Sequence, residues 1–127
     1  MTRINLLPVK ELCNKHLMAE FHEMPRLVKN LHTSLNRKAP FDVREIPSEY
    51  VLGKGHVKFF FNKFEYLHKR HTEITKELLL RGYRLTNIDS SIFASVDKMW
   101  YNDYTPTEKA IELNRQRVLE RLPRSKQ

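Results

Sequence analysis

The first candidate for chemistry in this sequence is the main-chain amine of Thr2. Thr2 is small enough that the initiator methionine in front of it is normally removed, which would leave a threonine α-amine. Such an amine has an ordinary pKa of about 7.7–8.0, well below the lysine value near 10.4. Part of it is therefore uncharged at neutral pH and can attack an aldehyde or the C1′ carbon of a sugar to form an imine. Ile4, Leu6 and Leu7 follow at once, and we expect their burial between helices to hold the amine in place.

A second group of candidates shares one side of the first predicted helix. His16, Glu20 and Glu23 are spaced by four and three residues, so they lie in one line beside the apolar stripe. The plain interpretation is a polar flank with ion pairs, and the alternative is a metal site made of one histidine and two carboxylates. No recognisable second pair of ligands accompanies them, so we expect no metal and no other cofactor.

Basic residues are the third feature, because 23 Lys and Arg against 15 Asp and Glu give a net charge of +8. This excess favours a polyanionic partner, nucleic acid before an acidic membrane surface. Arg117, Arg121 and Arg124 follow one another at steps of four and three on the last predicted helix. They form either a ridge that tracks phosphates or an ordinary solvated face. Trp100 and its neighbouring tyrosines could stack on an unpaired base or pack beneath their own loop.

The elements that position these residues are three helices, and we expect an all-α fold in a single domain spanning residues 1–127. Strand signals are weak throughout, and the two long connections around residues 39–56 and 83–104 indicate functional loops. The one cysteine, Cys13, excludes an intramolecular disulfide and favours a reducing compartment. No signal peptide and no stretch of membrane-spanning length is visible, so we expect a soluble, cytoplasmic protein.

The first helix is expected between Pro8 and Lys38, with a bend where Pro25 interrupts the hydrogen-bond ladder. Its apolar stripe consists of Leu17, Phe21, Met24, Val28, Leu31 and Leu35. The second helix follows Gly55 and ends at Gly82. Its stripe consists of Phe60, Phe64, Leu67, Ile74 and Leu78. The third begins at the sequence TPTE, with Thr105 as N-cap and Glu108 completing a capping box, and turns Ile111, Val118 and Leu122 inward.

Several short segments together resemble a known family. MTRINL, HLMAE, EMPR, LGKGHVKFF and RGY look like the phage-type pyrimidine-dimer DNA glycosylase/AP lyase, or endonuclease V, family. The likeness runs from Thr2 to about Tyr83 and continues more loosely through the third helix. It implies a compact fold of three helices with the N-terminal segment packed between helices, specifically between the first two.

The resemblance also implies a mechanism. In that family the N-terminal amine, here that of Thr2, attacks C1′ of the damaged nucleotide, the base leaves, and the imine undergoes β-elimination that nicks the strand. The glutamate of EMPR, here Glu23, is the catalytic carboxylate, and no metal is needed. Arg3 and Arg26 match arginines that hold the sugar-phosphate backbone.

His16 and Glu20 match residues that support the site, with His16 also near the DNA. His22 replaces an arginine of the phage enzyme, so the phosphate contact there would be weaker or pH-sensitive. The implied partner is double-stranded damaged DNA, kinked so that the lesion is reached, with Arg117 and Arg121 adding phosphate contacts. We expect a monomer. The alternative is a small helical DNA-binding protein without catalysis, which would need neither Thr2 nor Glu23.

Overall fold

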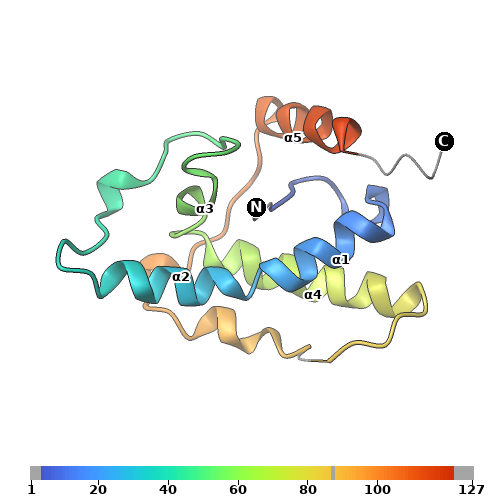
Figure 1. Ribbon diagram of the computed structural model, residues 1–127, viewed down its shortest axis with the longest axis horizontal. Coiled ribbons are helices and arrows are strands. Elements are labelled where there is room, and N and C mark those ends of the chain that lie inside the picture. The colour runs from blue at the N-terminus through green and yellow to red at the C-terminus, as the bar shows by residue number, and fades with distance from the viewer. Residues whose placement is uncertain (1–3, 87, 122–127) are drawn as a thin grey trace.

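The computed structural model describes residues 4–86 and 88–121, and their regular structure is entirely helical (Figure 1). The α-helices are α1 (Asn14–Glu23), α2 (Arg26–Leu35), α3 (His56–Phe59), α4 (Phe64–Leu80) and α5 (Glu108–Glu120). Short 3-10 helices lie in the connections: η1 (Val9–Glu11), η2 (Val43–Glu45), η3 (Ser90–Ala94) and η4 (Lys98–Trp100). The predicted all-α class is confirmed, since none of the described residues forms a strand.

The first predicted helix is divided in two at the proline. Met24 still donates its N–H to the Glu20 carbonyl at 2.9 Å, but Pro25 has no N–H to continue the ladder. The chain resumes with Pro25 as the residue before α2, and Val28 donates to the Pro25 carbonyl at 3.2 Å. The predicted bend is therefore a full break between α1 and α2, and the helical residues are 14–23 and 26–35 rather than one run toward Lys38.

The second predicted helix is also divided, because residues 60–63 form a turn between α3 and α4. The prediction of one continuous helix was wrong here. Phe59, Phe60 and Phe61 are all buried, and three consecutive side chains of an α-helix cannot share one face. The predicted end is confirmed: Gly82 has φ +93°, and Tyr83 donates its N–H to the Leu78 carbonyl at 3.1 Å, as in a Schellman motif.

The last helix starts two residues later than predicted. The N-cap is Thr107, whose hydroxyl accepts the Ala110 N–H at 3.1 Å, so Thr105 is not the cap and Glu108 opens the helix instead of completing a capping box. Both threonines are good N-caps, so the local pattern does not distinguish them. Ile111 and Val118 pack against the core as expected, whereas Leu122 lies outside the described residues.

The core joins the predicted apolar stripes to the N-terminal segment. Ile4, Leu6 and Leu7 are buried, and the segment runs between α5 and the layer formed by α1 and α4 (Figure 1). The segment packs between helices, as predicted. It does not lie between the first two predicted helices alone, because α5, the third, also bonds to it. Trp100 is also buried and contacts the ring of Phe41, so it packs beneath its connection and presents no ring to a base.

Within residues 4–86 and 88–121, no helix combines the length and the apolar character needed to cross a bilayer.

Candidate active site

A cavity of about 380 Å³ lies where α1, α5 and the N-terminal segment meet. It is lined by Asn5, Lys15, His16, Ala19, Glu20, Glu23, Arg117, Val118 and Arg121. Acidic and cationic residues therefore line one space, which is large enough for a sugar-phosphate unit. A larger hollow of about 680 Å³ runs along α2, but it is more open and none of its lining residues carries a carboxylate.

Glu23 is the last residue of α1, and the helix break that follows places it at the rim of the cavity. Its side chain retains 26% of its exposure, so solvent and a substrate can both reach the carboxylate. Arg26, the first residue of α2, approaches Glu23 Oε1 with Nη1 at 3.2 Å and is itself largely exposed. An accessible carboxylate beside an exposed guanidinium can move a proton and bind a phosphate at adjacent positions.

Glu20 lies one turn earlier on α1, but its environment is different because it is buried. Its Oε1 accepts hydrogen bonds from Asn5 Nδ2 at 2.9 Å and Arg70 Nη2 at 3.1 Å, and Arg70 Nε donates to Oε2. Burial lowers the pKa of Arg70, but the charge and hydrogen bonds of Glu20 outweigh it and raise that pKa. Arg70 Nη1 also donates to the Leu7 carbonyl at 2.8 Å, so this ion pair supports the N-terminal segment.

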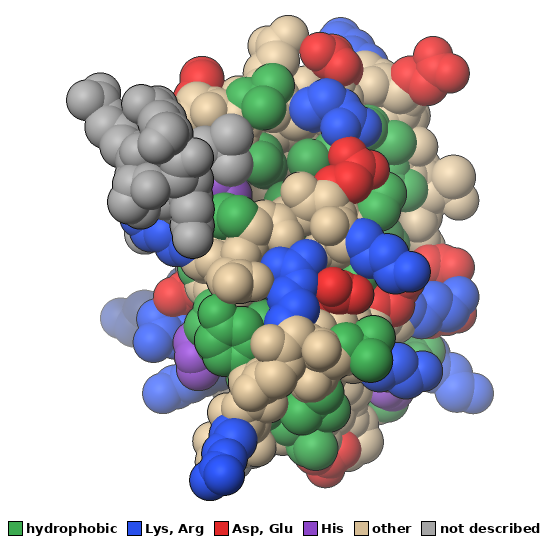
Figure 2. All heavy atoms as spheres, turned by 90° about the vertical axis from the view of Figure 1, so that its right-hand side faces the viewer, with side chains coloured by type: hydrophobic (Ala, Val, Ile, Leu, Met, Phe, Trp, Pro, Cys, Tyr) green, Lys and Arg blue, Asp and Glu red, His purple; other side chains and the backbone are tan. Residues whose placement is uncertain are grey.

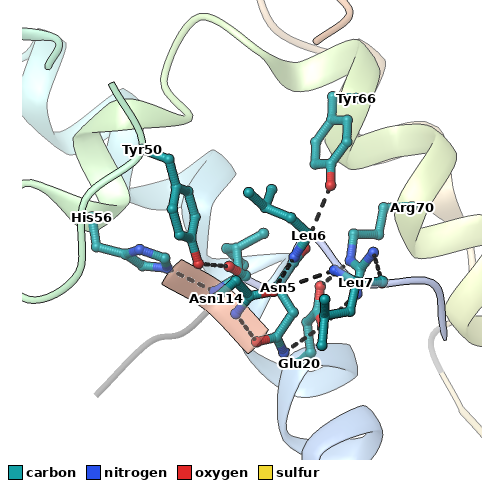
Figure 3. Close-up of polar contacts among 10 residues, drawn as sticks. Asn5, Leu6, Leu7, Glu20, Tyr50, His56, Tyr66, Arg70 and Asn114 are labelled. Carbon is teal, nitrogen blue, oxygen red and sulfur yellow. Dashed lines mark hydrogen bonds and ion pairs between the residues drawn. The ribbon is translucent and has the colours of Figure 1, made fainter. Parts of the chain in front are cut away.

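The start of the described chain is held by two further side chains from the connection and α3 (Figure 3). Ile4 donates its N–H to His56 Nε2 at 2.7 Å, and Tyr50 donates its hydroxyl to the Ile4 carbonyl at 2.9 Å. His56 Nε2 accepts a bond, so Nδ1 carries the proton and donates to the Val51 carbonyl at 2.9 Å. The sequence places His56 only at the end of a long connection, and no spacing rule connects it to a residue 52 positions away.

His16 ties α1 to the end of α5. Its Nε2 lies 2.9 Å from the Arg121 carbonyl, and Nδ1 is buried with no hydrogen-bond partner among the described residues. His16, Glu20 and Glu23 therefore share a side of α1, as predicted, but their polar atoms have different partners. Among residues 4–86 and 88–121, no group of three or more His, Cys, Asp or Glu side chains is arranged to hold a metal ion.

The remaining predicted residues are divided between the cavity and the surface. Arg117 and Arg121 line the cavity together with Lys15. His22 is exposed, packs edge-on against Phe21, and does not line the cavity. Thr2, Arg3 and Arg124 lie outside the described residues. On the face viewed in Figure 2, acidic side chains are interspersed among the basic ones.

A comparison with known protein families identifies a family that the chain matches. Residues 1–91 match the family described as pyrimidine dimer DNA glycosylase. The match includes the N-terminal segment and α1 to α4, and α5 lies beyond it. Because it covers most of the sequence, the chain belongs to the pyrimidine dimer DNA glycosylase family.

Proposed function

We propose that the protein breaks a glycosidic bond at pyrimidine dimers in DNA and cleaves the strand at the resulting abasic site through the α-amine of Thr2. The amine nitrogen attacks C1′ of the damaged nucleotide, and the glycosidic bond breaks as its electron pair leaves with the base. The nitrogen gives up a proton, and its lone pair forms the C1′=N bond as the C1′–O4′ bond of the sugar ring breaks and O4′ takes a proton. The resulting C1′ imine then loses a proton from C2′. The electrons of that C–H bond expel the 3′ phosphate, which nicks the strand, and water hydrolyses the imine to free the amine.

The observation that carries this proposal is the anchoring of the N-terminal segment beside an accessible carboxylate. Asn5 and Glu23 line the same cavity, and Ile4 is held through both its N–H and its carbonyl. Two residues of chain span at most about 7 Å, so the reach of the Thr2 amine from Ile4 is short. Fixing a nucleophile near its target in this way replaces much of the entropy loss of a bimolecular reaction.

Glu23 is the group that we propose transfers the protons. Its carboxylate can accept the C2′ proton and return a proton to the leaving group, as a general base and acid. Glu20 is unsuited to this role, because its side chain is fully buried and both oxygens bind Arg70. We therefore assign Glu20 to support and Glu23 to chemistry.

The test is to trap the imine with borohydride on DNA containing one abasic site, with a chelator present. We expect a covalent protein–DNA adduct on the peptide that begins with Thr2. A preparation that retains Met1, or one that is N-acetylated, should give none. A DNA-binding protein without catalysis would give no adduct in any preparation.

The adduct peptide must be identified because Lys63 is a competing amine. Burial lowers the pKa of Lys63 to about 8, so part of it is uncharged near neutral pH. Its Nζ donates to the Phe59 carbonyl and to Asn62 Oδ1, both at 2.8 Å, which leaves the amine engaged away from the cavity. An adduct on Lys63 would contradict the proposed nucleophile.

We propose that Arg117 and Arg121 contact phosphates, and salt dependence tests this. Neutralising one phosphate contact lowers the slope of log affinity against log salt by about 0.9 for duplex DNA. The double variant Arg117→Gln/Arg121→Gln should therefore lose about 1.8 from that slope, measured by fluorescence anisotropy with abasic duplex DNA. Arg44→Gln is the control, since Arg44 is exposed and pairs with Asp42 far along the chain from the cavity residues. An unchanged slope in the double variant would show that these arginines touch no phosphate.

A further inference from the structure

Asn114 is a buried polar side chain in the middle of α5, and all of its hydrogen bonds go to the N-terminal segment (Figure 3). Its Oδ1 accepts the N–H of Leu6 at 2.6 Å and that of Leu7 at 3.2 Å. Its Nδ2 donates to Asn5 Oδ1 at 2.9 Å. The side chain is fully buried, and both halves of its amide are used. Asparagine is a weak helix former, so helix propensity does not account for it at this position.

We propose that Asn114 is a positioning residue that fixes the register of the N-terminal segment and so the location of the reactive amine. This inference rests on the proposed function, in which the amine of Thr2 is the nucleophile. It makes α5, which lies beyond the 1–91 family match, a part of the catalytic unit.

The physical reason is that apolar burial alone does not set register. Burial of Ile4, Leu6 and Leu7 is stabilising but nearly non-directional, so the segment could slide and still bury apolar area. The N–H groups of Leu6 and Leu7 both donate to Asn114 Oδ1, and they can do so in only one register of the segment against α5. A slip would leave buried donors without acceptors, at a cost of about 1–3 kcal/mol for each group.

The bonds of Asn114 continue through the segment to α1 and α4. Asn5 receives the Asn114 amide on Oδ1 and donates from Nδ2 to Glu20, which is paired with Arg70. Arg70 in turn donates to the Leu7 carbonyl. The segment is therefore bonded from the α5 side through Asn114 and from the α4 side through Arg70. Removal of either side leaves residues 5–7 bonded from the other side alone, while Ile4 stays bonded to His56 and Tyr50.

The first test is Asn114→Leu, which has similar size and no hydrogen-bonding groups. Displacing a reacting group by about 1 Å can lower a rate about 100-fold, and we expect a loss of that order in the single-turnover rate of borohydride trapping. Affinity for abasic DNA should change little, because Asn114 is buried beneath the surface. Ile111→Ala is the matched control, since Ile111 packs on the core from the same helix without bonding to the segment. It should lower stability without lowering the trapping rate of the folded protein.

The second test is Asn114→Asp. For this variant we expect the trapping rate to depend on pH in a way that a merely structural role of Asn114 would not produce. A protonated aspartic acid reproduces both the acceptor and the donor of asparagine, whereas the carboxylate has no donor for Asn5 Oδ1. The trapping rate of this variant relative to wild type should therefore recover as pH falls from 8 to 5. For Asn114→Leu the same ratio should stay flat. A flat ratio for both variants would overturn the role of the donor.

Amide hydrogen exchange at Leu6 and Leu7 separates failure of this inference from failure of the proposed function. Exchange should accelerate at both amides in Asn114→Leu and not in Ile111→Ala, whether or not the protein is catalytic. Unchanged exchange, or equal rate losses in the two variants, would refute the positioning role. Absence of any adduct in the wild type would instead refute the amine mechanism. Accelerated exchange in Asn114→Leu would then still show that Asn114 holds the N-terminal segment in place.

Discussion

Replacing Glu23 with glutamine is expected to lower the rate of strand cleavage by about 10²–10⁴-fold, the range supplied by a general acid or base. Glutamine keeps the size of the side chain and an oxygen that can accept from Arg26 Nη1, which lies 3.2 Å from Glu23 Oε1. It cannot take the C2′ proton. Binding to damaged DNA should persist, because the cationic residues that line the cavity are unchanged. Cleavage is measured in single turnover on an abasic duplex, and affinity by anisotropy on the same DNA.

The Glu23→Gln experiment also divides the two steps of the reaction. If Glu23 acts mainly in β-elimination, the variant should still form an imine that borohydride traps, while the nicked product fails to appear. Glu112→Gln is the control, since Glu112 is exposed on α5 and does not line the cavity. Undiminished cleavage by Glu23→Gln would remove this residue from the mechanism.

The periodic core was predictable because its signal is local. The apolar stripes place Leu17, Phe21 and Leu31 on one side of their helices, and each is buried in the structure. Pro25 interrupts a helix because it has no N–H to donate, and Gly82 ends a helix because glycine adopts a positive φ without strain. Both effects depend only on the residue's own backbone. The turn at residues 60–63 was not predictable from periodicity, since it depends on burying three consecutive phenylalanines among distant neighbours.

The candidate site was predictable only in part, because its polar contacts join residues that are distant along the chain. Early apolar residues correctly indicated a buried N-terminal segment, but the hydrogen bonds that hold it come from distant residues, among them His56 and Asn114. These residues are 52 and 108 positions from their partners Ile4 and Leu6. Helical spacing reports neighbours within one element and says nothing about such pairs.

Glu20 and Glu23 show that helical spacing also fails to predict which residue has which function. Their spacing places both on one side of α1, and spacing alone does not distinguish the two carboxylates. Their roles diverge because Arg70, fifty residues further along the chain, pairs with Glu20 in the interior, while Glu23 keeps its access to solvent. We therefore propose that the first carboxylate supports the structure and the second acts on the substrate.

The largest effect on stability is expected for Arg70→Met. Removing one partner of a buried ion pair leaves an uncompensated charge and typically costs about 3–5 kcal/mol, a large part of the 5–15 kcal/mol that stabilises an ordinary domain. In this variant Glu20 would keep only the hydrogen bond from Asn5, and the Leu7 carbonyl would lose its donor from Arg70. Urea denaturation at neutral pH measures the loss.

A double variant distinguishes the orphaned charge from lost packing. Glu20→Gln/Arg70→Met removes both charges and retains a side chain that can accept from Asn5, so it should be more stable than Arg70→Met alone. Arg115→Gln is the control, because Arg115 pairs with Glu11 at 2.6 Å but both side chains are more than 40% exposed. Such surface pairs contribute at most about 1 kcal/mol. If Arg70→Met were no more harmful than Arg115→Gln, the Glu20–Arg70 pair would not be what holds the N-terminal segment against α4.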